Sequence, residues 1–241
     1  MSKLNTPTSN YESGSYQESQ LSLSLRTEDI IVPGAILTET LHDHLYGSSF
    51  VIGDRAFAVG GGMLGMFTGS TSNTKNEEYD PVLNAWSLRA PMLSARRYFC
   101  TFVKDGKGYV ARGHSHVAID SWGYEVNMTI DSYSPSTNTW TTEYTSCIDV
   151  NGRAAGIRGY NDHTPDAVVV DGIIYIIGGD HGTRIEVIEN NVPRLLKNEW
   201  NNEVQLYLSS PVCAFVKNKS IYISSIESKL VKCIRIVIIH A

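Results

Sequence analysis

The strongest constraint on the fold is a hairpin-like element that recurs roughly every fifty residues along the chain. Each copy has two short apolar runs around a polar turn, with an aromatic residue inside the second run. These aromatic residues are Phe57, Tyr109, Tyr175 and Tyr222, which lie 52, 66 and 47 residues apart. Turn sequences such as Asp-Gly adopt the positive φ angles that a tight hairpin requires. The sequence therefore predicts an all-β chain made of repeated units.

A second element lies between the hairpins. Residues 78–86 read Glu-Tyr-Asp-Pro-Val-Leu-Asn-Ala-Trp, and residues 132–140 read Ser-Tyr-Ser-Pro-Ser-Thr-Asn-Thr-Trp. The two tyrosines are 54 residues apart, and so are the two tryptophans. Proline restricts φ and asparagine tolerates the left-handed region, so the element predicts a turn between two strands that carry the aromatic residues.

Together these motifs resemble the kelch repeat. The resemblance consists of Gly-Gly at a strand end (residues 60–61 and 178–179), Tyr-x-Pro-x-x-Asn-x-Trp, and then Pro91-Met92 and Arg96. It covers residues 45–225, with Arg112 and Ser225 standing where the first glycine is expected. It implies a kelch-type β-propeller of about 3.5–4 recognisable blades, in which glycines, tyrosines and tryptophans pack adjacent blades.

The number of blades leaves the closure of the ring open. Propellers typically have 4–8 blades, and an open series leaves a sheet face uncovered. Three alternatives follow: a degenerate four-blade ring, a fragment of a longer reading frame, or a partial propeller that other chains close within an oligomer or larger assembly.

The domain prediction separates residues 1–40 from residues 41–241. Residues 1–25 are rich in Ser, Thr, Asn, Gln and Tyr. Such a segment buries too little apolar surface to offset its ordering entropy, so residues 1–40 are expected to form a flexible polar arm and residues 41–241 the kelch-like blades.

Charge and hydropathy indicate the compartment and exclude some partners. The net charge of −5 and the lack of a basic stripe exclude nucleic acid as a partner. The first residues contain no apolar signal sequence, and no apolar run reaches 18 residues. The sequence therefore predicts no membrane association and a cytoplasmic location, with a virus particle as the alternative.

The candidate binding surface follows from the alternating strand direction. Loops after Gly-Gly and loops after the Trp emerge on one face, where propellers carry their recognition residues. The partner-binding residues predicted on this face are Arg96, Arg97, Arg112, Arg184, His114, His116, Asp180 and His181. Because guanidinium groups bind carboxylates through two hydrogen bonds, the expected ligand is an acidic peptide or an acidic glycan. For Arg96, a structural role bonding loop carbonyls between blades stays open.

No catalytic residue, cofactor or metal is predicted. The chain has no Gly-x-Ser-x-Gly elbow, no His-Glu-x-x-His motif and no phosphate-binding loop. His114, His116, Asp180 and His181 carry metal-ligating atoms but are expected to be solvated loop residues. The chain is expected to be a non-enzymatic scaffold that binds a protein partner. The alternatives are a structural or adhesive subunit of a larger particle, viral or phage-like, and a sugar-acting enzyme resembling sialic-acid mutarotase.

Overall fold

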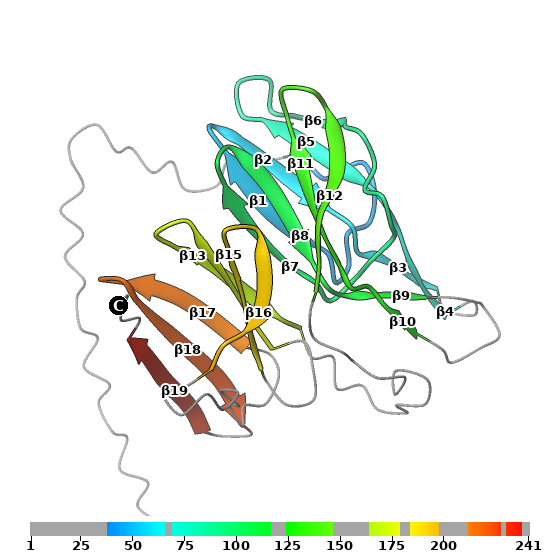
Figure 1. Ribbon diagram of the computed structural model, residues 1–241. Coiled ribbons are helices and arrows are strands. Elements are labelled where there is room, and N and C mark those ends of the chain that lie inside the picture. The colour runs from blue at the N-terminus through cyan, green and yellow to red at the C-terminus, as the bar shows by residue number, and fades with distance from the viewer. Residues whose placement is uncertain are drawn as a thin grey trace, which may run out of the picture. The chain divides into compact units, whose positions relative to one another are not determined.

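The computed structural model describes residues 38–65, 69–116, 124–146, 164–178, 184–197, 212–227 and 230–237 (Figure 1). All of them belong to one compact unit, Leu37–Ala241. Every regular element in these segments is a β-strand, which confirms the prediction of an all-β chain. None of the described residues belongs to a helix of the length and apolarity that crossing a bilayer demands.

Four antiparallel sheets follow one another along the chain, and each is called a blade. Blade 1 consists of β1 (Ser48–Ile52), β2 (Arg55–Val59), β5 (Asn76–Asp80) and β6 (Ala85–Leu88). Blade 2 consists of β7 (Cys100–Lys104), β8 (Lys107–Ala111), β11 (Thr129–Ser134) and β12 (Thr139–Thr145). Blade 3 consists of β13 (Asp166–Val170), β14 (Ile173–Ile177), β15 (Ile185–Glu189) and β16 (Val192–Leu195). Blade 4 contains β17 (Val212–Lys217), β18 (Ser220–Glu227) and β19 (Leu230–Val237).

Two short ribbons extend from the first two blades. One pairs β3 (Gly62–Gly65) with β4 (Gly69–Ser72), and the other pairs β9 (His114–His116) with β10 (Tyr124–Val126). Each ribbon lies between the second and third strands of its blade in the chain. The ribbons therefore belong to the loops that follow the Gly-Gly position.

The turns have the backbone geometry that the sequence predicts. Asp105 and Asp171 have φ values of 50° and 49°, and Asn84 and Asn138 have φ values of 48° and 53°. The side-chain oxygen of each of these two asparagines accepts a 2.8 Å hydrogen bond from the tyrosine hydroxyl of its own motif. The Tyr-x-Pro-x-x-Asn pattern thus encodes a turn whose asparagine supplies both the left-handed residue and a hydrogen bond.

The blades pack as in a propeller, with the first strand of each blade against the first strand of the next. β1 contacts β7, β7 contacts β13, and β13 contacts β17. Three buried apolar clusters fill the three spaces between successive blades. The predicted placement of the four repeated hairpins in successive blades is therefore confirmed.

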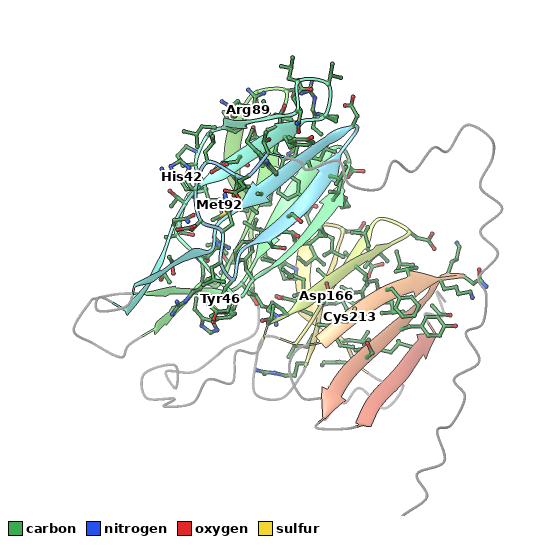
Figure 2. The ribbon with its side chains drawn as sticks, turned by 180° about the vertical axis from the view of Figure 1, so that it is seen from behind. His42, Tyr46, Arg89, Met92, Asp166 and Cys213 are labelled. Atoms are coloured by element: carbon green, nitrogen blue, oxygen red, sulfur yellow. The ribbon has the colours of Figure 1, made fainter. Side chains whose placement is uncertain are left out.

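Neighbouring blades are also joined by polar contacts at their first strands. The Ser48 and Thr101 hydroxyls are 2.9 Å apart between blades 1 and 2. Between blades 3 and 4, Asp166 accepts a 2.6 Å hydrogen bond from the amide of Ala214, the residue after Cys213 (Figure 2). Burial raises the pKa of Asp166, because desolvation of its carboxylate outweighs the hydrogen bonds that it accepts.

Cys100, in β7, is expected to resist alkylation in the folded protein. Its side chain lies in the core between blades 2 and 3, and burial raises the pKa of its thiol to about 12. The reactive species is the thiolate, so at neutral pH iodoacetamide should modify the exposed Cys213 and leave Cys100 intact until the protein unfolds. Peptide mapping by mass spectrometry measures both sites; rapid native labelling of Cys100 would contradict the prediction.

Candidate functional site

One buried acidic residue occupies the same register position in each of the first three blades. Glu77, Asp131 and Glu186 lie on the third strand of their blades, opposite the second strand. All three have no exposed surface. A buried carboxylate is costly unless it is paired with a cation or accepts several hydrogen bonds, so each of these residues requires partners.

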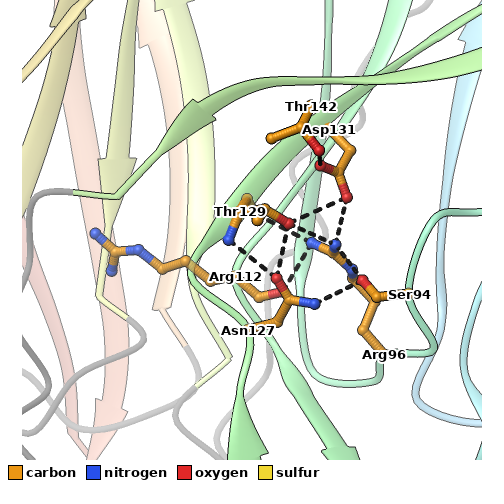
Figure 3. A network of polar contacts seen from close by, with 7 residues as sticks. All are labelled: Ser94, Arg96, Arg112, Asn127, Thr129, Asp131 and Thr142. Carbon is orange, nitrogen blue, oxygen red and sulfur yellow. Dashed lines mark hydrogen bonds and ion pairs between the residues drawn. The ribbon is translucent and has the colours of Figure 1, made fainter.

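Asp131 is paired with Arg96, which is also fully buried (Figure 3). The Nη2 atom of Arg96 lies 2.5 Å from Asp131 and donates to the hydroxyls of Ser94 and Thr129 at 2.7 and 3.0 Å. Its Nη1 atom donates to the carbonyl oxygens of Thr129 and Arg112 at 3.2 and 3.3 Å. Desolvation lowers the pKa of Arg96, and the charge of Asp131 opposes that effect. Arg96 therefore ties the loop entering blade 2 to the inner part of that blade.

Glu186 is paired with Arg112, which crosses from blade 2 to blade 3. Arg112 occupies the position of Gly60 and Gly178 in the neighbouring blades and has a φ of 63°. Its Nη1 atom donates to the carbonyl of Gly178, and its Nη2 atom lies 3.1 Å from Glu186. Ser146 donates a further 2.8 Å hydrogen bond to this carboxylate. The departure from the repeat pattern thus supplies an ion pair between blades.

The same exchange is impossible at Gly60. A Cβ atom there would lie 2.8 Å from the carbonyl oxygen of Arg96 and 2.8 Å from the ring of Phe99. The φ of 57° does not distinguish Gly60 from Arg112, whose φ is 63°, so the difference lies in these close contacts. Arginine is therefore tolerated at this repeat position in blade 2, whereas blade 1 requires glycine.

Glu77 of blade 1 is paired with histidines. His42 Nδ1 lies 2.8 Å and His44 Nε2 3.4 Å from its carboxylate, and the amide of Leu41 donates at 2.6 Å. His44 precedes the backbone bridge Leu45–Gly62, just as Arg96 precedes the bridge Arg97–His114. Residues 38–47, which include His42 and Tyr46 (Figure 2), therefore repeat the path of residues 90–99 in front of the next blade.

The other predicted site residues are distributed unevenly. Arg97 is 4% exposed, and its guanidinium lies 5.5 Å from the ring centre of Tyr98. Its backbone exchanges hydrogen bonds of 3.0 and 2.9 Å with His114, in the same strand as His116. Arg184 is partly exposed, and its carbonyl accepts a hydrogen bond from Gly178. Asp180 and His181 lie outside the described residues.

The structure thus brings Arg96 and Arg112 together in the interior, not on an open face. Their guanidinium groups bond carbonyls and buried carboxylates, and Arg97 is equally enclosed. For Arg96 this is a structural role, as the sequence left open, but the carbonyls that it bonds belong to blade 2 and do not lie between blades. Sequence reasoning missed the buried acids, although Glu77 and Asp131 each lie two residues before the tyrosine of the Tyr-x-Pro motif. That shared position was the available signal.

Comparison with known proteins bears on the family. No family model matches the chain. The human "Kelch repeat and BTB domain-containing protein 12" is 29% identical over 128 residues, which are 52% of this chain and 19% of that protein. The structure of YjhT superposes with a TM-score of 0.55 at 17% identity, covering 74% of this chain and 58% of that one. The chain thus spans only part of either protein. With its repeated motifs and successive antiparallel blades, the chain carries kelch-like repeats and has a kelch-type β-propeller fold.

Proposed function

We propose that the chain is a non-enzymatic scaffold that binds a protein partner through exposed turns of its blades. The observation that carries the proposal is an apolar pair at the tip of the turn between β5 and β6. Val82 is 84% exposed and Leu83 is 72% exposed. The corresponding residues of blade 2 are Ser136 and Thr137, which are also exposed. The fold at this turn therefore does not require aliphatic side chains, and exposed apolar surface of this kind suits contact with another protein.

The turn is held rigidly enough to present these side chains. The carboxylate of Asp80 accepts hydrogen bonds from the amides of Val82 and Leu83 at 2.8 and 3.1 Å. Asp80 is itself paired with Arg55, and this contact lowers the pKa of Asp80. A turn that is already ordered loses little conformational entropy when a partner binds.

The repeat supports a protein as the class of partner. Kelch-repeat proteins generally bind protein partners, and the chain carries that repeat. The acidic peptide and the acidic glycan were both expected from guanidinium groups on the loop face, and those of residues 96, 97 and 112 are buried. Either acidic ligand on the loop face remains a proposal that rests on Arg184, with Asp180 and His181 outside the described residues.

The test compares partner capture by four immobilised forms of the full chain: the wild type, a turn variant, a control variant and Arg184→Ala. The variant Val82→Ser/Leu83→Thr gives blade 1 the turn residues of blade 2, so the fold should be kept. Proteins captured by the wild type and lost with this variant are then purified and measured by calorimetry, where at least a tenfold weaker affinity is expected. Arg89→Ala, a surface change, serves as the matched control. Equal affinity of wild type and turn variant for every purified partner would overturn the turn as the site; loss with Arg184→Ala instead would place binding on the loop face.

A further inference from the structure

The series of described blades ends in two faces that no other described blade covers, and these faces have opposite roles in the contact between blades. Each blade has a forward face, which packs against the next blade in the chain, and a rear face, which packs against the previous one. Inside the chain this contact occurs three times. The forward face of blade 4 and the rear face of blade 1 are the two halves without a described neighbour.

The contact between blades 1 and 2 shows how the two halves fit. On the forward side, Phe50 and Phe57 stack with ring centres 5.1 Å apart. On the rear side, Tyr133 and Trp140 lie 5.1 Å apart, and Phe57 meets Tyr133 at 5.5 Å. The ring of Phe50 lies directly on Gly108, where a Cβ atom would be 2.2 Å from the ring. The aromatic pair on the forward face of blade 1 therefore packs against the rear face of blade 2, where a small residue lies beside a Tyr–Trp pair.

Blade 4 presents the forward half of this contact. Phe215 pairs in register with Tyr222, as Phe50 pairs with Phe57. The two rings stack with centres 5.1 Å apart and planes inclined by 6°. Phe215 is nevertheless 48% exposed. Ile221 and Ile223, which flank Tyr222 in β18 and lie on the opposite face of the sheet, are buried against blade 3. The pair thus has the geometry of the inter-blade contact, and its Phe215 ring is exposed.

Blade 1 presents the rear half. Tyr79 and Trp86 lie 5.2 Å apart, in the register of Tyr133 and Trp140. Trp86 donates a 2.9 Å hydrogen bond to the carbonyl of Thr38, as Trp140 does to that of Ala90. Trp86 is nevertheless partly exposed, whereas Trp140 is only 8% exposed.

The remainder of this rear face also matches the covered one. Ala56 stands in the register position of Gly108, opposite Val51, which is 60% exposed. In blade 2 the ring of Phe50 packs on Gly108, and the equivalent residue of blade 1, Ala56, is also small.

We infer that two copies of this chain associate head to tail, with the forward face of blade 4 of each copy on the rear face of blade 1 of the other. Phe215 then lies on Ala56 as Phe50 lies on Gly108, and Tyr222 meets Tyr79 as Phe57 meets Tyr133. The occupant is a second copy because the two faces are complementary halves of a contact that the chain already uses between its own blades. Two such contacts related by a twofold axis cover both faces of both copies.

The test is sedimentation velocity on the full chain and its variants over a wide concentration range. The wild type is expected to be a dimer at high concentration. Phe215→Asp on the forward face and Trp86→Asp on the rear face should each be monomeric. Val51→Asp, at a more exposed rear position, repeats the rear-face test should Trp86→Asp fail to fold, and near-ultraviolet circular dichroism checks folding of all forms. Val82→Ser/Leu83→Thr should stay dimeric, which separates this inference from the proposed partner site.

Mixing the variants distinguishes head-to-tail association from the symmetric alternative. In a mixture of the two variants, Trp86→Asp supplies an intact forward face and Phe215→Asp supplies an intact rear face. Dimers should therefore reappear, with a weaker affinity than that of the wild type because only one of the two contacts can form. A mixture that stays monomeric, a rear-face variant that remains fully dimeric, or a wild type that is monomeric at all concentrations would each overturn the inference. A continuous series of larger oligomers would overturn the inference that two copies close into a dimer.

Discussion

Replacing Arg96 by alanine is expected to lower the free energy of unfolding by about 3–5 kcal/mol, because it leaves a buried carboxylate without its cation. The side chain of Asp131 is 1% exposed, so water cannot replace the guanidinium. The hydroxyls of Thr129 and Thr142 remain, but two hydroxyl donors do not neutralise the charge. The midpoint of thermal unfolding should shift downward by about 6–20 °C for a domain of this size. Urea unfolding followed by tryptophan fluorescence measures the free-energy change.

Two controls show that the effect belongs to the buried pair. Arg89→Ala removes an ion pair with Glu78 of 2.7 Å, but Arg89 is 38% exposed, so a loss below about 1 kcal/mol is expected. Arg96→Lys keeps the charge but cannot match the fork of donors that reaches two carbonyls, two hydroxyls and a carboxylate, so it should recover only part of the stability. If Arg96→Ala were as mild as Arg89→Ala, the pair with Asp131 would not hold the blade.

Replacing Arg112 by glycine is expected to destabilise the protein by about 1–4 kcal/mol, although it restores the residue that the repeat pattern favours. Removing a left-handed non-glycine residue relieves about 1–2 kcal/mol, whereas taking the arginine partner away from the buried carboxylate of Glu186 costs about 3–5 kcal/mol. The carboxylate has no exposed surface and would retain only the Ser146 hydroxyl among the partners described above. The ion-pair loss therefore outweighs the backbone relief.

The companion variant for Arg112→Gly neutralises the acid as well. In Arg112→Gly/Glu186→Gln the buried charge is gone, so this double variant should be more stable than Arg112→Gly alone. Thermal and urea unfolding of the wild type, both single variants and the double variant form a double-mutant cycle that gives the coupling energy. An Arg112→Gly protein as stable as the wild type would show that the bridge between blades 2 and 3 contributes nothing.

Much of the fold could be predicted from the sequence because the repeat is encoded locally. The turn residues Asp105, Asn84 and Asn138 adopt the left-handed conformations that their sequence context favours. Alternating apolar residues place Phe57, Tyr109, Tyr175 and Tyr222 at one register position of successive hairpins. Such features depend on neighbours within a few residues, so spacing along the chain is enough to reveal them.

The candidate site was harder to predict because its partners come from distant parts of the chain. Arg96 meets Asp131 and Arg112 meets Glu186 across 35 and 74 residues. Arginines in loops are ordinarily exposed, and the sequence alone did not show which buried acid each would face. The prediction of an arginine-rich binding face therefore grouped residues by loop, whereas burial assigned Arg96, Arg97 and Arg112 to the interior.

The sequence by itself determined the repeating hairpins, the turn chemistry and the order of the blades, since these follow from local φ preferences and from apolar residues in alternation. Only the tertiary structure decided which charges are buried, why arginine is accepted at residue 112 and not at residue 60, and which two faces have no described neighbouring blade. The physical reason is that burial and ion pairing depend on the packing of one blade against the next, which brings together residues that are far apart in the chain.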